Sequence, residues 1–276
     1  MKGIMSLLLA AVFCFSMQVS AQEQEITMGY KDDSKKPLIG DPGDDSGLYQ
    51  ELFSKAAAMI GYKLRIERLP KKRLYAKFEK GELDFYPGAS FSEERAMYMC
   101  FLDNGLKTKE VLITRSDLPE IRDISTVAGK LLADLGGSKS DFNKKYNKIQ
   151  VVEVASLELE RAIEMLKAGR ADFYIADIEE VDYYQKSKGL KSYEDIGMKV
   201  HYQAFGDFIP MYMGFSMNSK LFKAKANPRY DSSKPLDYEN TPKTVAEDCV
   251  AHQFQAALLK LKASGETQKL YDAYFK

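Results

Sequence analysis

A weak internal repeat is the sequence feature that most constrains the fold. The segments RLYAKFEKGELDFY (73–86) and RAIEMLKAGRADFY (161–174) align without gaps and match at an Arg, a Gly and the closing Asp-Phe-Tyr. Each has the pattern of an amphipathic helix, a Gly that ends the helix, and an apolar strand that begins at Asp-Phe-Tyr. Any helix–Gly–strand unit of an α/β protein shares this pattern, so the two segments alone leave chance similarity open.

The residues before each copy favour duplication over chance. Both copies follow a strand, a helix and a second strand, so the order strand–helix–strand–helix–strand occurs twice. This order predicts two α/β lobes with mainly parallel sheets. The elements expected before the copies are a strand at 25–30, a helix at 47–62 and a strand at 63–69, and then a strand at 130–136, a short helix from about Ser140 and a strand at 148–154.

Two further apolar segments, 109–117 and 208–216, are predicted to cross between the lobes. The polar loop and the two helical segments after them are expected to pack back on the first lobe. Two crossings make a hinge, and a hinge implies a cleft between the lobes. The predicted division places residues 22–112 and 209–276 in lobe 1 and residues 113–208 in lobe 2.

The first 21 residues have the pattern of a cleaved signal peptide. Lys2 gives a charged start, residues 4–15 an apolar core, and residues 19–21 a small-residue cleavage site. The apolar run is too short to span a bilayer comfortably, and the bulky Phe13 before Cys14 disfavours a lipoprotein site. The mature chain is therefore expected to be soluble and exported, and the family resemblance given below implies the periplasm.

Charge and composition exclude several classes of protein. Removal of the signal peptide removes Lys2 and no acidic residue, which leaves 39 basic residues against 40 acidic ones. This balance argues against nucleic-acid binding, which usually needs a basic excess. No His/Cys cluster has metal spacing and no Gly-x-Ser-x-Gly motif occurs, so we expect no cofactor and no metal. His201 and His252 are expected at the surface or in packing, and Cys100 and Cys249 either form a disulfide or remain two buried thiols.

Arg95 is the first candidate binding residue, because its position is unusual for a cation. Ser92 has the features of a helix N-cap, and Glu93 and Glu94 follow in the first turn, where the helix dipole favours negative charge. Arg95 then falls at about the third helical position, just beyond the end of a predicted strand, where open α/β sheets bind ligands. Either it binds an anion there, or it pairs with a nearby acid on a solvated helix face.

The second copy of the repeat supplies a matching candidate, Asp177, at the end of its own strand. If the lobes face each other, Arg95 and Asp177 lie on opposite sides of the cleft. This pair suits a free amino acid, whose carboxylate would bind Arg95 and Ser90 and whose ammonium group would bind Asp177. Asp177 is also a credible N-cap for the helix that follows it, and the two roles are compatible.

A Gly-rich turn, DLGGSKSDF (134–142), is a third candidate. Gly136 and Gly137 allow the backbone to approach a ligand closely, and the N-terminus of the following helix presents free N–H groups to an anion. The spacing matches neither a P-loop nor a dinucleotide-binding motif. A ligand-contacting turn and an ordinary tight turn both stay open.

The chain resembles the bacterial periplasmic solute-binding proteins of family 3, the amino-acid receptors of ABC importers with the type II periplasmic-binding fold. The resemblance covers essentially the whole mature chain and is carried by GLYQELFSKAAAMIGY, KGELDFYPGASFSEER, GKLLADLGGSKSDF, AGRADFYIAD and KASGETQKLYDAYF. It implies a two-lobed α/β fold with two hinge crossings and a central ligand cleft. The site residues that it implies are Arg95 and Ser90 for the α-carboxylate, the backbone near Gly88, Asp177 for the α-ammonium group, and Gly137, Ser138 and Lys139 from lobe 2.

Two departures from the family pattern bear on the ligand. The loop after the first strand, 31–38, lacks the aromatic residue that often stacks on the ligand, and Lys139 stands where a hydroxyl is typical. Together with Arg73 and with Lys35 or Lys36, Lys139 indicates a more anionic ligand, such as an acidic amino acid or a small carboxylate. The alternative is that these cations point to solvent.

The function expected from the sequence is capture of a small polar solute by hinge closure, for delivery to a membrane ABC permease. The resemblance implies a binding protein rather than an enzyme, acting as a monomer without nucleic acid. Two alternatives stay open. One is an enzyme similar to the family relatives that became dehydratases of cyclic carboxylates, and the other is a periplasmic sensory protein that docks to a separate receptor.

Overall fold

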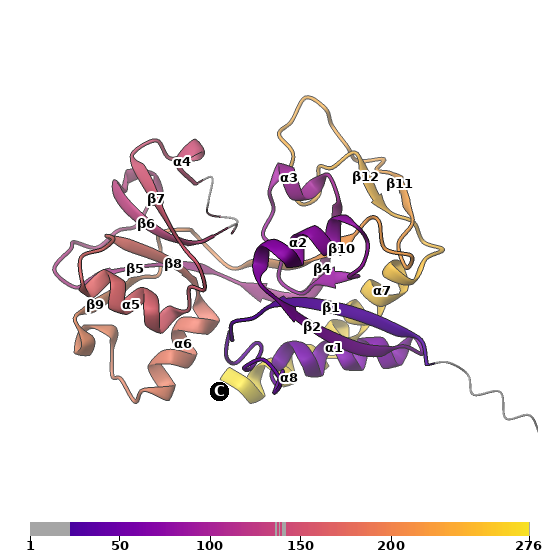
Figure 1. The fold of residues 1–276 in the computed structure, drawn as a ribbon, viewed down its shortest axis with the longest axis horizontal. Coiled ribbons are helices and arrows are strands. Elements are labelled where there is room, and N and C mark those ends of the chain that lie inside the picture. The colour runs from indigo at the N-terminus through magenta and orange to yellow at the C-terminus, as the bar shows by residue number, and fades with distance from the viewer. Residues whose placement is uncertain (1–22, 136, 138, 140–141, 276) are drawn as a thin grey trace, which may run out of the picture.

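Two β-sheets form the two lobes of the protein (Figure 1). The computed structural model describes residues 23–135, 137, 139 and 142–275, so the predicted signal peptide lies outside the described residues. The sheet of lobe 1 has the strand order β2 (Lys63–Leu69), β1 (Glu25–Lys31), β3 (Phe85–Tyr86), β10 (Ile209–Ser216) and β4 (Met99–Thr108). The sheet of lobe 2 has the order β7 (Ile149–Val154), β6 (Gly129–Asp134), β8 (Phe173–Asp177), β5 (Glu110–Arg115) and β9 (Met198–His201).

The two sheets share one topology. In lobe 1, β2, β1 and β3 are parallel, and β10 runs antiparallel to both of its neighbours. In lobe 2, β7, β6 and β8 are parallel, and β5 runs antiparallel to both of its neighbours. The prediction of two α/β lobes is thus confirmed, but each sheet is mixed, with two parallel and two antiparallel pairings between neighbouring strands. The strand that crosses back antiparallel, β10 or β5, accounts for the difference from mainly parallel sheets.

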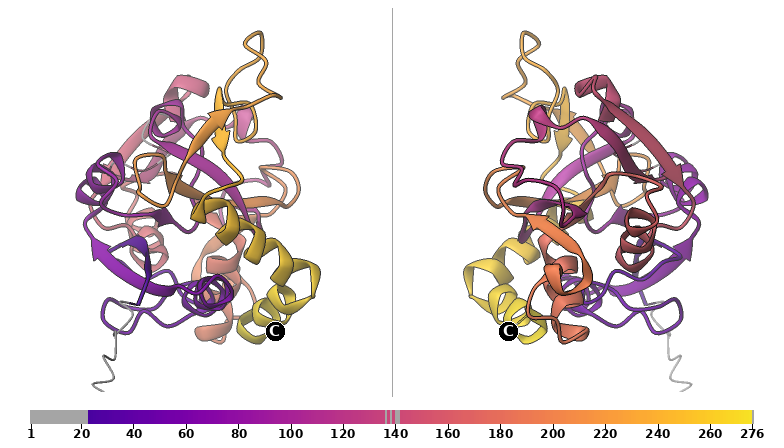
Figure 2. Two further views of the ribbon diagram at one scale, coloured as in Figure 1. Left: turned by 90° about the vertical axis from the view of Figure 1, so that its right-hand side faces the viewer. Right: turned by 90° about the vertical axis from the view of Figure 1, so that its left-hand side faces the viewer.

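Helices cover the sheets, and the C-terminal helices return to lobe 1. Figure 2 shows α7 and α8 in yellow along one side of the molecule, where α7 contacts α1 and β4, and α8 contacts α1, α7 and α6. Lobe 1 contains α1 (Leu48–Met59), α2 (Lys71–Glu79), α3 (Glu93–Ala96), α7 (Val250–Ala263), α8 (Glu266–Phe275) and the hairpin of β11 (Ala224–Ala226) and β12 (Lys243–Val245). Lobe 2 contains α4 (Phe142–Lys145), α5 (Leu159–Lys167), α6 (Ile178–Ser187) and two short 3-10 helices, η1 (Ile124–Thr126) and η2 (Tyr193–Ile196).

The chain crosses between the sheets at two places. The first crossing is short, because β4 ends at Thr108 and β5 begins at Glu110. The second lies between the end of β9 at His201 and the start of β10 at Ile209. The predicted boundary after residue 112 falls inside β5, whose pairing with lobe 2 starts at Glu110. The crossing itself is polar, because Lys107, Thr108, Lys109 and Glu110 precede the apolar residues of β5. The sheet therefore changes before this apolar run and not within it.

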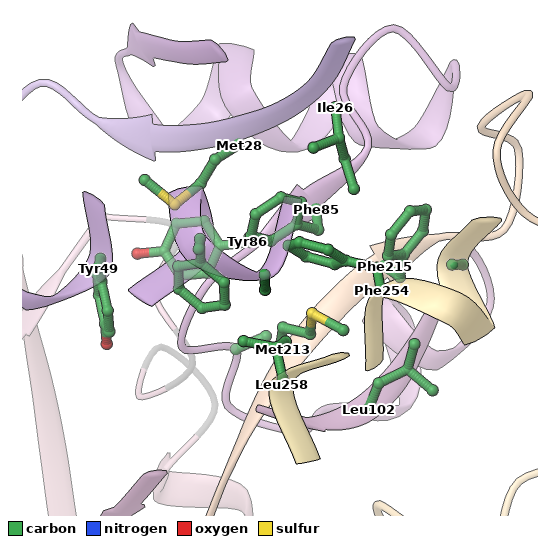
Figure 3. Packing of buried hydrophobic residues seen from close by; sticks show 14 of the residues in the cluster. Ile26, Met28, Tyr49, Phe85, Tyr86, Leu102, Met213, Phe215, Phe254 and Leu258 are labelled. Atoms are coloured by element: carbon green, nitrogen blue, oxygen red, sulfur yellow. The ribbon is translucent and has the colours of Figure 1, made fainter. Parts of the chain in front are cut away.

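An aromatic cluster in lobe 1 fixes the strand that leads to the cleft. Phe85 in β3 lies 5.1 Å from Phe254 in α7 and 5.1 Å from Phe53 in α1, measured between ring centroids. Phe215 in β10 and Met213 join the same buried cluster (Figure 3). Segments that are distant in the sequence therefore hold β3 in place immediately before the loop that carries the candidate site.

The repeat corresponds to equivalent structures in the two lobes. Asp84 accepts a hydrogen bond from Thr27 N–H in β1, at 2.7 Å, and its own N–H donates to the Thr27 carbonyl. Asp172 makes the same pair of bonds with Lys130 in β6, again with 2.7 Å to the carboxylate. The aspartate of the repeat thus ties the third strand of each lobe to the first, which explains why this residue recurs.

The remaining candidates from the composition have structural roles. Cys100 and Cys249 are free and buried, and burial raises the pKa of the Cys100 thiol to about 12. His201 is buried in lobe 2, where Nδ1 accepts from Ile121 N–H and Nε2 lies 2.8 Å from Thr114 Oγ1. In the described part of the chain, no helix is long and apolar enough to cross a membrane. Nor do those residues contain a group of three or more His, Cys, Asp or Glu side chains that could hold a metal ion.

We expect Asp84→Ala to lower the free energy of unfolding by about 2 kcal/mol, because it leaves the buried Thr27 N–H and the Ser219 hydroxyl without their acceptor. Urea denaturation followed by circular dichroism measures this change. Asp117→Ala is the matched control, since the Asp117 side chain is 70% exposed, and it should change stability by less than about 0.5 kcal/mol. Equal unfolding free energies for wild type and Asp84→Ala would contradict the structural role of the repeat.

Candidate functional site

A cavity of about 140 Å³ lies between the two lobes. Its walls come from the carboxyl ends of β1 and β3 in lobe 1 and of β6 and β8 in lobe 2. Six of the residues predicted from the sequence line it, namely Gly88, Ser90, Arg95, Gly137, Lys139 and Asp177. Arg73 is exposed on α2 and does not line it, and Ser138 lies outside the described residues.

Arg95 lies buried at the lobe 1 wall of the cavity. Ser92 caps α3 as predicted, because its hydroxyl accepts from Arg95 N–H at 3.2 Å. The guanidinium lies over the Tyr75 ring, 4.4 Å from the ring centroid, and donates from Nη1 to the Ser90 carbonyl at 3.0 Å. No carboxylate of the described residues forms an ion pair with it. The alternative that Arg95 pairs with an acid on a solvated helix face is therefore wrong.

The loop between β3 and α3 is held rigidly against lobe 1. The Pro87 carbonyl accepts from the buried Asn104 side chain at 2.7 Å, and Ala89 N–H donates to the Tyr212 carbonyl at 2.7 Å. A Cβ at Gly88 would lie 2.7 Å from the Tyr49 hydroxyl oxygen. Gly88 therefore allows the loop to pack directly on Tyr49, and this packing places Ser90 and Arg95 at the cavity.

Asp177 ends β8 on the opposite wall and is paired with a cation of the protein itself. Its carboxylate forms an ion pair across the cleft with the Lys35 ammonium group, which also lies 3.9 Å from Glu180 Oε2. Asp177 occupies the N-cap position of α6 but makes no capping hydrogen bond with its side chain. The structure thus places Asp177 in the cleft as predicted, and it adds a lysine that the amino-acid interpretation did not pair with it.

A second set of ion pairs across the cleft centres on Asp134, at the end of β6. Asp134 Oδ2 lies 3.1 Å from Lys71 Nζ and 3.4 Å from Lys31 Nζ, both from lobe 1, while Oδ1 accepts from Leu157 N–H. Burial by itself would raise the pKa of Asp134, but Lys31 and Lys71 outweigh it and hold this pKa below its ordinary value. Burial lowers the pKa of Lys71. Sequence reasoning missed all three residues, although Asp134 ends a strand at the same sheet edge as Asp177, and Lys31 ends a strand of the lobe 1 sheet that faces it.

The Gly-rich turn of lobe 2 approaches this ion pair closely. A Cβ at Gly137 would lie 2.8 Å from the Asp134 carbonyl oxygen and 3.2 Å from Lys71 Nζ. Its N–H donates to the Asp134 carbonyl at 2.8 Å, so this donor is used by the turn itself. Lys139 faces the cavity and pairs with Glu110 at 2.6 Å. Of the expected short helix, the described residues contain α4 (Phe142–Lys145), while its predicted start at about Ser140 lies outside them, as does Gly136.

Tyrosines supply the aromatic surface that the loop at 31–38 lacks. Tyr30, Tyr75, Tyr86 and Tyr174 all line the cavity, and burial raises the pKa of each hydroxyl. The Tyr30 and Tyr86 rings stack with centroids 5.2 Å apart. Tyr86 and Tyr174 are the equivalent last residues of the two repeat copies. The repeat in the sequence therefore marked two of the tyrosines that line the cavity.

The loop after β1 makes further contacts with lobe 2. Ser34 donates from N–H and Oγ to Glu158 Oε1, at 3.2 and 3.3 Å, and Ser156 Oγ donates to Asp33. Lys36, by contrast, pairs with Asp41 on the surface of lobe 1. The structure is therefore that of a closed cleft, in which Lys35 points into the cavity and Lys36 does not.

A family model for bacterial extracellular solute-binding proteins, family 3, matches residues 26–276. The chain belongs to this family. No curated protein sequence matches the chain closely enough to count as a relative.

Solved structures of amino-acid-binding proteins share the family fold. An ancestral arginine-binding protein bound to arginine superposes with a TM-score of 0.65, at 17% identity over 92% of this chain and 99% of that chain. The ancestral amino acid-binding protein AncCDT-1, described as a precursor of cyclohexadienyl dehydratase, gives 0.62, at 16% identity over 91% and 95% of the two chains. A histidine kinase sensor domain gives 0.64, at 17% identity over 91% and 96%. The type II periplasmic-binding fold is thus confirmed.

We expect Asp134→Ala to shift the protein toward an open cleft, because Lys31 and Lys71 would lose their shared carboxylate in lobe 2. Small-angle X-ray scattering should then give a larger radius of gyration than for wild type. Asp41→Ala is the control, since its ion pair with Lys36 stays within lobe 1. A radius of gyration that is unchanged in Asp134→Ala would contradict this role of the ion pairs.

Glu179 predicts a pH dependence of stability. Its buried side chain accepts from Thr108 Oγ1 at the first crossing, at 2.9 Å, while Oε1 has no hydrogen-bond partner among the described residues. Burial, and then the charge of Asp177, raise its pKa from 4.5 to about 7. Between these values the folded protein binds more protons than the unfolded chain, so this stabilisation is complete below about pH 4.5 and is lost as the pH rises through about 7.

Glu179→Gln removes this proton equilibrium, so its stability relative to wild type should increase with pH across this window, by up to about 3 kcal/mol. Urea denaturation at pH 5, 6, 7 and 8 measures the difference. Glu164→Gln, on the exposed face of α5, is the control and should show no such trend. A difference that does not vary with pH would show that Glu179 is ionised throughout.

Proposed function

We propose that the protein binds a small polar solute, an amino acid or a related carboxylate, by closure of its two lobes. The observation that carries this proposal is the guanidinium of Arg95, which is buried at an inter-lobe cavity without a carboxylate partner among the described residues. Carboxylates bind guanidinium groups bidentately in such settings. Ser90, beside Arg95 in the same wall, is the second group that we assign to the solute anion.

The mechanism is capture by hinge closure. In the open form the charged groups at the strand ends are hydrated, and a solute that contacts both lobes favours the closed form by its differential affinity. Binding with micromolar affinity requires about −8 kcal/mol. A few charge-assisted hydrogen bonds at about 1.5–3 kcal/mol each supply this after the losses of association.

Delivery to an ABC importer in the periplasm is the physiological role that we infer. The family description as extracellular solute-binding proteins and the signal-peptide pattern of residues 1–21 support it. The proposed partner is a membrane permease that recognises the closed form of the monomeric protein. Docking to a sensory receptor is distinguished from transport by assaying uptake in a strain that lacks the protein.

An enzymatic activity is the second candidate, and Glu180 is the observation that favours it. Glu180 lines the cavity, and burial raises its pKa, as general acids require. Because the fold is similar to that of a precursor of cyclohexadienyl dehydratase, cyclic carboxylates are the substrates to test for this activity. Incubation of the purified protein with prephenate or arogenate, followed by detection of aromatic product, tests it directly.

We expect Arg95→Ala to weaken solute binding at least tenfold, because the variant loses the cation that faces the cavity. A thermal-shift screen of amino acids and carboxylates identifies the solute, since a ligand of the native state raises stability by RT ln(1 + [L]/Kd). Calorimetry then compares the dissociation constants.

Arg229→Ala, at a side chain that is 78% exposed, is the control and should bind as wild type does. Wild-type affinity in Arg95→Ala would refute the site.

A further inference from the structure

Lys35 occupies the position that the amino-acid interpretation assigns to the solute. Its ammonium group forms the ion pair with Asp177 across the cleft and lies 3.9 Å from Glu180 Oε2. In the site expected for a free amino acid, the α-ammonium group would bind this same carboxylate. The Asp177 carboxylate at the end of β8 is thus already paired with a cation of the chain.

The backbone holds Lys35 in place for this role. Lys35 N–H donates to the Ile39 carbonyl at 2.9 Å, and Ile39 N–H donates back to the Lys35 carbonyl at 3.0 Å. The following residues are tied to α1, because the N–H groups of Leu48 and Tyr49 donate to the carbonyls of Pro37 and Leu38. The lysine therefore extends toward Asp177 from a fixed loop.

The Lys35 ammonium group stays charged in the closed cleft. Burial by itself would lower its pKa, but Asp177 and Glu180 outweigh burial and raise this pKa well above 10.5. A second ammonium group, brought by an amino acid, would have to share the carboxylates with Lys35 or displace it. Like charges at short range repel strongly where water is excluded.

The charges that remain favour an anion. Five cationic and four anionic side chains line the cavity, and Arg95 is the cation without a carboxylate partner among the described residues. Lys71 and Lys31 share Asp134, and Lys31 also pairs with Asp33. Lys139 pairs with Glu110, and Lys35 pairs with Asp177 and, at 3.9 Å, with Glu180. The tyrosine walls offer ring faces and neutral hydroxyls to the rest of the solute.

We propose that the solute is a small carboxylate without an α-ammonium group, such as a 2-oxo or 2-hydroxy acid. This inference rests on the proposed function. Lys35 supplies the ammonium group that an amino acid would bring, and so it determines specificity. Arg95 binds the carboxylate of the solute, and Asp177 holds Lys35 rather than the ligand.

Matched pairs of compounds test this inference on the wild-type protein. Each amino acid forms one pair with its 2-oxo acid and one with its 2-hydroxy acid, and the two members of a pair differ only at C2. The panel contains alanine with pyruvate and lactate, glutamate with 2-oxoglutarate and 2-hydroxyglutarate, and phenylalanine with phenylpyruvate and phenyllactate. Thermal shift finds the pair that binds, and calorimetry compares its members. We expect the oxo or hydroxy acid to bind at least tenfold more tightly than the amino acid.

A lysine variant then tests whether Lys35 causes the preference. Lys35→Met removes the ammonium group and keeps an unbranched side chain that ends at Cε, which leaves Asp177 available to the ligand. We expect the preference for the carboxylate to fall at least tenfold, with a gain in affinity for the amino acid. Lys36→Met is the matched control, because the adjacent Lys36 pairs with Asp41 on the surface, and it should keep the wild-type preference.

The outcomes separate this inference from the proposed function. An amino acid that binds wild type as tightly as its oxo or hydroxy counterpart overturns the role of Lys35 and leaves solute binding intact. An unchanged preference in Lys35→Met overturns it as well. If no compound of the panel binds wild type, the proposed function and the inference fall together. The wild-type comparison stays decisive even if Lys35→Met does not fold.

Discussion

Ion pairs between the lobes are the interaction on which the rest of the structure depends. Lys31, Lys35 and Lys71 reach from lobe 1 to carboxylates of lobe 2, so closure removes water from charged groups on both sides. The cost of desolvation offsets much of the Coulomb attraction in buried ion pairs, and their net contribution is therefore small. The ion pairs alone therefore leave only a small free-energy difference between the open and closed forms. A modest additional interaction with a solute then decides whether the lobes stay together.

Arg95 is a buried charge whose loss of hydration the contacts of the protein compensate only in part. A cation–π contact with Tyr75 and one hydrogen bond to the Ser90 carbonyl replace only part of the hydration that a guanidinium loses on burial. The anionic solute that we propose would supply the missing counter-charge, most effectively once the cleft excludes water. The same side chain therefore opposes closure without a solute and favours closure with one.

The sequence predicted the fold and two charged residues of the site, but not the ion pairs that connect the lobes. The repeat predicted the lobes. Because open α/β sheets bind ligands beyond the carboxyl ends of their strands, Arg95 and Asp177 were expected at one site, and both line the cavity. The same rule applies to β1 and β6, so it could also have identified Lys31 and Asp134. The Lys35–Asp177 pair was not, because it depends on how a loop folds and on how far the lobes close. Arg73 and Lys71 differ for a simpler reason: both lie on α2, and only the packing of that helix decides which one faces the cleft.

The two lobes carry opposite charges where their equivalent strands meet. β1 and β6 occupy the same place in sheets of the same order, and the residues that end them, Lys31 and Asp134, meet at 3.4 Å. Two identical lobes that face each other would bring like residues together at such a point, and like charges would keep the cleft open. Divergence of the two copies to a cationic strand end in lobe 1 and an acidic one in lobe 2 turns this repulsion into attraction. The repeat that builds two similar lobes can therefore close on a small solute only because its copies differ where they meet.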